Sequence, residues 1–142
     1  MRPDARKSVA ALKGARDLTR ILVVDDLKDI TETTSLLFEA LGHDTRVAAD
    51  GRQAVDATLA FEPDIIFMDL DMPVLNGYEA AREIRQAPLA RQPFLVALTA
   101  ATGAATEVAT RAVGYDFHLR KPADTNALLA LVADLSTRTR AP

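Results

Sequence analysis

Five side chains that could take part in chemistry stand at or just after the ends of short apolar runs: Asp25, Asp26, Asp69, Thr99 and Lys121. If these runs are strands of a parallel sheet, their carboxyl ends share one edge. Open α/β sheets bind ligands at that edge, where the strand order reverses. We therefore expect Asp25, Asp26 and Asp69 to meet there, with the threonine and the lysine beside them.

Three crowded carboxylates repel one another, and either protonation or a bound cation relieves the repulsion. Oxygen ligands select a hard divalent ion such as Mg²⁺, which keeps several waters and takes one or two carboxylates plus phosphate oxygens. The predicted cofactor is Mg²⁺, and this coordination leaves one aspartate free to react.

Asp69 is the expected reacting group, because a carboxylate nucleophile can form an acyl phosphate whose developing charge a metal ion stabilises. The ammonium group of Lys121 can pair with phosphate oxygens, and the hydroxyl of Thr99 can donate one hydrogen bond to them. The sequence contains no GxxxxGK[ST] motif, the signature of a phosphate-binding P-loop. Asp69, Thr99 and Lys121 are therefore the predicted catalytic residues.

The elements that must position these residues follow from the apolar pattern. Continuous apolar runs over residues 21–24, 65–68 and 94–98 predict central strands that are covered on both faces. Mixed runs over residues 45–48 and 116–119 predict the two edge strands. Because amphipathic segments alternate with these runs, we expect an α/β fold with a doubly wound, five-stranded parallel sheet of order 2-1-3-4-5, the flavodoxin-like (βα)5 arrangement.

Between the strands, apolar residues recur at helical spacing, so each intervening segment is expected to bury one face against the sheet. The predicted faces are Ile30, Leu37 and Leu41; Ala54, Ala57, Thr58 and Phe61; Tyr78, Ala81 and Ile84; and Leu128, Leu131, Val132 and Leu135. Gly42 is expected to close the first helix as its C′ residue. Residues 104–112 predict the weakest helix, because only Val108 and Val113 offer larger apolar anchors.

Length and composition limit the class of protein. A chain of 142 residues has room for about one domain. It has no cysteine for a disulfide and no apolar run long enough to cross a bilayer, so we expect a cytoplasmic protein without a membrane partner. The formal net charge of -3 argues against direct nucleic-acid binding, which usually needs a clustered basic surface.

The start of the sequence stands apart from this pattern. Lysine and arginine outnumber acidic residues there, and it lacks the continuous apolar stretch of a secretory signal. We interpret residues 1–19 as a flexible N-terminal extension, with a functional arm as the alternative. Residues 20–136 form the predicted domain, and residues 137–142 a C-terminal tail.

Four motifs carry a family resemblance: Val23-Val24-Asp25-Asp26, then Met68 to Pro73 leading to Asn76-Gly77-Tyr78, then Leu98-Thr99-Ala100, and finally Leu119-Arg120-Lys121-Pro122. Over residues 20–136 the sequence resembles the receiver domain of bacterial two-component response regulators. Each motif alone also has a plain structural interpretation, such as a helix cap for the acidic pair or a surface charge for Lys121. Their combination is what makes the resemblance specific.

The resemblance implies roles for individual residues. Asp69 would be phosphorylated, and Asp26 and Asp69 would ligate Mg²⁺ directly. Asp25 would act largely through metal-bound water, and Asp71 would contribute its backbone carbonyl. The peptide bond before Pro122 would be cis.

As a function, the resemblance implies a phosphorylation-dependent switch of a phosphorelay, and not an enzyme that acts on small molecules. A histidine kinase or histidine phosphotransfer protein would donate the phosphoryl group, and the domain would catalyse its own phosphorylation and dephosphorylation. The surface of the fourth helix, fifth strand and fifth helix would meet a downstream protein, with the domain a monomer or a phosphorylation-dependent homodimer. A stand-alone regulator and a piece of a hybrid kinase both fit.

One position departs from the family pattern. Three residues before the lysine the family usually has tyrosine or phenylalanine, and this sequence has His118. Our hypothesis is that His118 reports phosphorylation by moving toward Thr99, with its charge state adding a pH dependence.

Two other functions compete with this interpretation. Asp69-Leu70-Asp71 also has the Asp-x-Asp spacing of haloacid-dehalogenase-type phosphohydrolases, but position 73 is proline where that family has threonine, and a separate acidic pair precedes. A flavodoxin-like cofactor binder needs a Ser/Thr/Gly-rich loop after the first strand. Residues 25–29 are Asp-Asp-Leu-Lys-Asp, whose charge would repel a phosphate without a metal.

Overall fold

A computed structural model describes residues 19–101 and 103–138. The elements run in the order β1 (Arg20–Val24), α2 (Lys28–Ala40), β2 (Asp44–Ala48), α3 (Gly51–Phe61), β3 (Ile65–Asp69), α4 (Gly77–Gln86), β4 (Phe94–Thr99), α5 (Ala104–Ala112), β5 (Phe117–Arg120) and α6 (Thr125–Arg138). All strand pairs are parallel, and the sheet order is β2-β1-β3-β4-β5. The predicted α/β class and the predicted strand order are confirmed.

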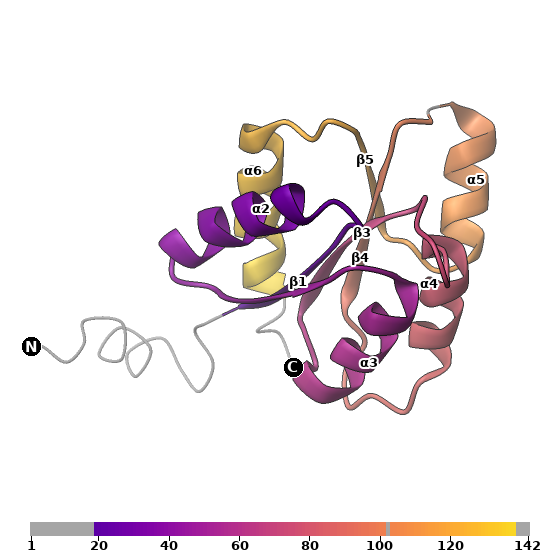
Figure 1. Ribbon diagram of the computed structural model, residues 1–142, viewed down its shortest axis with the longest axis horizontal. Coiled ribbons are helices and arrows are strands. Elements are labelled where there is room, and N and C mark those ends of the chain that lie inside the picture. Colours follow the sequence, from indigo (N-terminus) through magenta and orange to yellow (C-terminus); the bar gives the residue numbers. More distant parts are fainter. Residues whose placement is uncertain (1–18, 102, 139–142) are drawn as a thin grey trace, which may run out of the picture.

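The sheet is covered on both sides, as Figure 1 shows, with α2 and α6 on one side and α3, α4 and α5 on the other. Alternate residues of β1 face opposite layers, because side chains alternate along a strand. Leu22 and Val24 belong to the core under α3 and α4, and Ile21 and Val23 to the core under α2 and α6. The central strands β1, β3 and β4 are therefore buried on both faces, as their continuous apolar runs predict.

The buried face of α2 differs from the predicted one. Ile30 and Leu41 are exposed, whereas Thr31 and Phe38 are buried. Phe38 stacks on Phe67 of β3 with ring centroids 5.4 Å apart, so this aromatic contact sets how the helix faces the sheet. Thr31 can be buried because its hydroxyl donates to the Lys28 carbonyl at 3.0 Å. The prediction of Ile30 and Leu41 as core residues is wrong.

The other helix predictions hold better. Ala54, Thr58 and Phe61 are buried, as are Ala81 and Ile84 of α4 and, in α6, Leu128, Val132 and Leu135. Gly42 follows the last residues of α2 with a φ of 94°, which fits a C′ glycine. In α5 only Thr110 is buried, and Val108 is 69% exposed, so Val113 alone serves as the predicted anchor.

The ends of the domain were expected at residues 20 and 136. Residues 1–18 of the predicted extension and 139–142 of the predicted tail lie outside the described residues. Thr19 is buried, and its hydroxyl donates to Ser136 at 2.8 Å, which ties the start of β1 to α6. Helix α6 continues to Arg138. Among the residues that the structure describes, none of the helices is both long and apolar enough to span a bilayer.

Candidate functional site

Three carboxylates meet at the carboxyl edge of β1 and β3. Asp69 is the last residue of β3, and Asp25 and Asp26 follow directly after β1, its neighbour in the sheet. One carboxylate oxygen of each lies within 4.8 Å of those of the other two. Asp25 and Asp69 are 1% and 3% exposed, while Asp26 is open to solvent. The predicted convergence of these side chains is therefore present.

Lys121 brings a positive charge to the same place. Its backbone N–H donates to the Thr99 carbonyl at 2.9 Å, which continues the pairing of β5 with β4 and holds the lysine at this edge. Its Nζ lies 3.1 Å from Oδ2 of Asp25 and 3.4 Å from Oδ2 of Asp69. The peptide bond between Lys121 and Pro122 is cis, as expected.

The charges in this cluster shift one another. Burial raises the pKa of the Asp69 carboxyl, and the nearby charge of Asp25 raises it further. The N–H of Asp71, which donates to Oδ1 of Asp69 at 3.2 Å, and the ammonium of Lys121 act in the opposite direction without cancelling the rise. Burial lowers the pKa of Lys121, but its hydrogen bond to Asp25 and the charge of Asp69 outweigh that effect, so the pKa is raised. The cluster thus holds more negative charge than its one ammonium balances.

This donor set fits a hard divalent cation. The ligand atoms on offer are carboxylate oxygens, which Mg²⁺ prefers, and no thiol or imidazole belongs to the acidic group found in the described residues. Asp69 is destabilised as an anion, and a cation beside it would relieve that cost. Asp25, Asp26 and Asp69 are therefore the side chains that would hold the metal.

The remaining predicted site residues lie around this cluster. Thr99 ends β4 and is buried, and its Oγ1 accepts the N–H of Ala101 at 3.0 Å. The Asp71 side chain is exposed, and its backbone lies against Asp69 through the hydrogen bond given above. His118 is half-buried on β5, beside Ala97 of β4. Its Nε2 is buried, and within the described part of the chain it has no hydrogen-bond partner.

The plain structural interpretations of these residues fit less well. The N-cap of α2 is Leu27, which has no side-chain cap, and Asp25 accepts instead from the Leu27 N–H at 3.0 Å within the preceding turn. The N-cap of α5 is Gly103, not Thr99. Asp69 is buried and so is not part of a solvated loop. Asp69 ends the third strand and Asp71 follows it, which disfavours the dehalogenase-type interpretation, in which such a pair follows the first strand.

Two residues that connect α4 to the turn before β5 were not predicted from the sequence. The Tyr115 hydroxyl donates to the Gly77 carbonyl at 2.8 Å, just beyond the loop that follows Asp69. Arg85 in the last turn of α4 donates to the segment before β5. Tyr115 lies in a turn and Arg85 at a helix end, where apolar periodicity carries no signal. A buried tyrosine needs a partner for its hydroxyl, and that chemical demand is the one available hint.

Known proteins are similar to this chain in sequence. Residues 21–133 match the family model of the response regulator receiver domain. Response regulator MprA of Mycolicibacterium vanbaalenii is 37% identical over 120 residues, which cover 84% of this chain and 51% of that protein. Response regulator SaeR of Staphylococcus aureus is 30% identical over 123 residues, which cover 87% of this chain and 53% of that protein. The chain spans about half the length of these curated relatives.

Solved structures are similar in the same way. The Francisella response regulator 1452 receiver domain matches with a TM-score of 0.79 at 30% identity, over 86% of this chain and 99% of that chain. The receiver domain of the sensor histidine kinase PA1611 from Pseudomonas aeruginosa PAO1, solved with a magnesium ion coordinated in its active-site cleft, matches with a TM-score of 0.75 at 30% identity. That match covers 84% of this chain and 98% of the other. Fold, acidic cluster and family match agree, and the chain belongs to the response regulator receiver domain family of two-component signalling.

Proposed function

We propose that this domain accepts a phosphoryl group from a phosphohistidine onto Asp69, with Mg²⁺ as cofactor, and works as a switch in a phosphorelay. The observation that carries the proposal is the position of the Asp69 carboxylate. It lies at the end of a central strand, beside the carboxylates of Asp25 and Asp26 and 3.4 Å from Nζ of Lys121. A nucleophile, a cation site and a phosphate-pairing ammonium are thus close together.

The proposed transfer needs no further reactant. A carboxylate oxygen of Asp69 forms a bond to phosphorus, the phosphorus–nitrogen bond of the phosphohistidine breaks, and the imidazole leaves with the electron pair. Bound Mg²⁺ supplies charge neutralisation for the phosphoryl oxygens. The Lys121 ammonium pairs with those oxygens and the Thr99 hydroxyl donates to them, while Asp71 offers a backbone carbonyl to the metal. Attack of water on phosphorus releases phosphate and restores the carboxylate.

The proposed donor is a histidine kinase or a histidine phosphotransfer protein. A groove of about 750 Å³ opens beside Lys121 between α2 and the start of α6, and the residues lining it are mostly apolar. Ile30, which is exposed and not a core residue as predicted, lines this groove together with Pro122 and the half-buried Leu37. Exposed apolar surface next to a reactive group supports docking of a protein rather than of a small phosphate ester. We place this exchange in the cytoplasm, without nucleic acid or membrane as a direct partner.

The proposed output surface consists of α5, β5 and α6, which the family counts as its fourth helix, fifth strand and fifth helix. We propose that His118 responds there to phosphorylation by moving toward Thr99. The buried Nε2 of His118, which has no hydrogen-bond partner among residues 19–101 and 103–138, supports this, as does its place on a surface pocket of about 280 Å³ that Glu107 and Arg111 also line. If His118→Ala leaves the affinity for the downstream partner unchanged in both phosphorylation states, this part is wrong. Pairing of two phosphorylated copies over the same surface is the expected alternative to a monomer.

The acceptor assignment is tested by treatment with acetyl phosphate, with and without Mg²⁺, followed by intact mass measurement. We expect a gain of one phosphoryl group in the wild type with Mg²⁺ and none in Asp69→Asn. Asp71→Asn is the matched control, because it makes the same change two residues away on an exposed side chain. Equal modification of the wild type and Asp69→Asn would refute the assignment. Steady turnover of a small ester such as p-nitrophenyl phosphate would favour a phosphohydrolase instead.

A further inference from the structure

A buried tyrosine joins α4 to the turn that leads into β5. Tyr115 is 4% exposed and packs in the core under α3 and α4. Its hydroxyl donates to the carbonyl of Gly77, the first residue of α4, at 2.8 Å. Burial raises the pKa of the Tyr115 phenol far above its ordinary value, so the hydroxyl keeps its proton and remains a donor. A phenylalanine would fill the same space without making this bond.

The acceptor of this bond lies against the phosphoacceptor strand. A Cβ added to Gly77 would stand 2.8 Å from the Asp69 carbonyl oxygen and 2.8 Å from Cα of Leu70, closer than real Cβ atoms come. The Gly77 N–H donates to the Leu70 carbonyl at 3.0 Å. The loop of residues 70–76 therefore leaves Asp69 and returns to the same point. A shift of that loop would therefore displace Gly77, whose carbonyl accepts the hydrogen bond from Tyr115.

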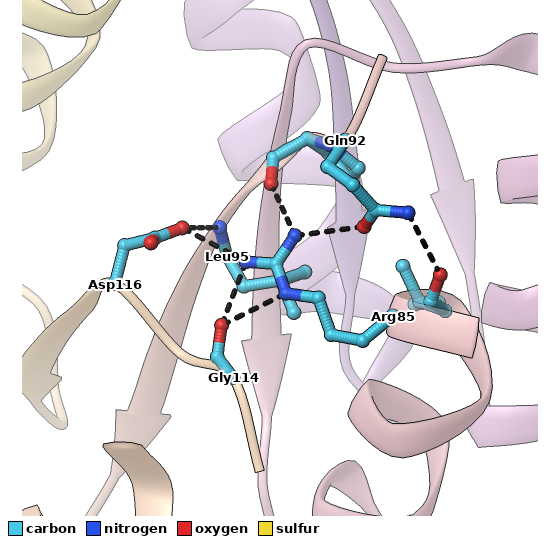
Figure 2. Close-up of polar contacts among 7 residues, drawn as sticks. Arg85, Gln92, Leu95, Gly114 and Asp116 are labelled. Atoms are coloured by element: carbon cyan, nitrogen blue, oxygen red, sulfur yellow. Dashed lines mark hydrogen bonds and ion pairs between the residues drawn. The ribbon is translucent and has the colours of Figure 1, made fainter. Parts of the chain in front are cut away.

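The same turn is held at the other end of α4. Arg85 donates to the Gly114 carbonyl from Nε at 3.0 Å and from Nη2 at 2.6 Å, and to Oδ2 of Asp116 at 2.9 Å. Figure 2 shows the guanidinium group of Arg85 enclosed by these acceptors and by Gln92. The turn of residues 113–116 is thus attached to the first residue and to the last turn of α4. Helix and turn are joined as one unit.

We propose that Tyr115 is a positioning residue that couples the loop after Asp69 to the turn before β5, so that α4 carries the response to phosphorylation toward α5 and β5. This rests on the proposed function of Asp69. The route is separate from the one through Thr99 and His118. It reaches the same strand, because His118 follows Tyr115 by three residues and β5 begins at Phe117. A chain that lacks the usual aromatic residue at position 118 then still has a tyrosine whose hydroxyl senses the acceptor loop.

The test compares Tyr115→Phe with the wild type and with Tyr78→Phe, the matched control at the only other tyrosine of the sequence. Each protein is treated with acetyl phosphate and Mg²⁺, the extent of phosphorylation is read by intact mass, and the amide chemical shifts of residues 104–120 are followed by NMR. For residues 104–120, we expect the ratio of the phosphorylation-induced conformation to the unphosphorylated one to be about two- to tenfold lower in phosphorylated Tyr115→Phe than in the phosphorylated wild type. That factor corresponds to the loss of one neutral hydrogen bond. Phosphorylation itself should continue, and Tyr78→Phe should behave as the wild type.

The outcomes separate the possible failures. A full wild-type shift response in phosphorylated Tyr115→Phe overturns the coupling role, even if the variant melts at a lower temperature, since that pattern marks a purely structural residue. No phosphorylation of the wild type defeats the proposed function instead. If Tyr115→Phe does not fold, wild-type protein labelled with 3-fluorotyrosine decides the matter. The fluorine resonance of Tyr115 is then expected to move on phosphorylation, and a resonance that stays fixed overturns the proposal.

Discussion

Two charge clusters of this domain are built in opposite ways. Around Arg85, five N–H groups donate to the carbonyls of Gly114 and Pro93, to Gln92 and to Asp116, so every donor of the guanidinium has an acceptor. Asp116 also accepts the N–H of Leu95 at 2.9 Å. Around Asp69, three carboxylates face one ammonium, and burial disfavours the ionised acceptor.

The contrast separates a cluster that fixes structure from one that awaits a ligand. A polar network whose members are all satisfied holds its segments in one arrangement. A cluster with surplus buried charge costs stability until a binding partner removes the surplus. The same fold therefore contains a network beside α4 in which every donor of Arg85 has an acceptor, and a cluster at the carboxyl edge of the sheet whose negative charge is only partly balanced. Removing a charge should have opposite effects on stability in the two places.

The largest effect is expected where the network is complete. Arg85→Ala should lower the free energy of unfolding by about 2–4 kcal/mol, because it leaves the partly buried carbonyls of Gly114 and Pro93 without this donor and removes the ion pair with Asp116. Chemical denaturation at neutral pH measures this change.

Arg52→Ala is the matched control for that measurement. Arg52 also pairs with one carboxylate, that of Glu83, but both side chains are more than two-fifths exposed. Exposed pairs contribute about 0–1 kcal/mol. If Arg85→Ala costs no more than Arg52→Ala, the view of a complete structural network around Arg85 is wrong.

A smaller and opposite effect on the free energy of unfolding is expected when Mg²⁺ binds at the cluster of Asp25, Asp26 and Asp69. A ligand that binds only the folded state at about 100 times its Kd adds about 2.7 kcal/mol to the free energy of unfolding. We expect a rise of this kind in the wild type on addition of MgCl₂, and a much smaller rise in Asp26→Asn. Arg85→Ala should gain as much as the wild type, because the two clusters share no residue and distant effects add. Loss of the Mg²⁺ response in Arg85→Ala would show that the clusters are coupled.

The convergence of the candidate site residues was predictable from the sequence because it depends mainly on the topology of the sheet. Asp25, Asp69 and Lys121 lie far apart along the chain, but each follows an apolar run. In a parallel sheet the ends of such runs must come together. Neither fine packing nor rotamers enter that inference. The strand order could be inferred for the same reason, since central and edge strands differ in how continuous their apolar runs are.

Packing details were not predictable in this way. Ile30 and Leu41 are apolar at helical spacing and yet exposed, because the stacking of Phe38 on Phe67 turns another face of α2 inward. Tyr115 acts through one hydrogen bond and Arg85 through several, and no period in the sequence marks such bonds. Sequence patterns do not decide which of two possible helix faces is buried or which side chains form hydrogen bonds between segments, because three-dimensional contacts determine both.

The smallest expected effect tests whether removing a charge from the acidic cluster stabilises the fold, in contrast to removing the charge of Arg85. In the absence of metal, Asp69→Asn should raise the free energy of unfolding by about 1 kcal/mol at pH 7, because it removes a buried carboxylate whose pKa lies above the ordinary 3.8. A raised pKa favours the folded state below pH 3.8, where the group is protonated in both states. That advantage is lost as the pH rises through the folded pKa. The difference between variant and wild type should therefore grow from pH 3.8 toward neutrality, as followed by urea unfolding in EDTA. Asp71→Asn, which changes an exposed carboxyl, should show no such trend. A wild type more stable than Asp69→Asn at pH 7 would mean that Lys121 already balances the cluster, and the contrast with Arg85 would disappear.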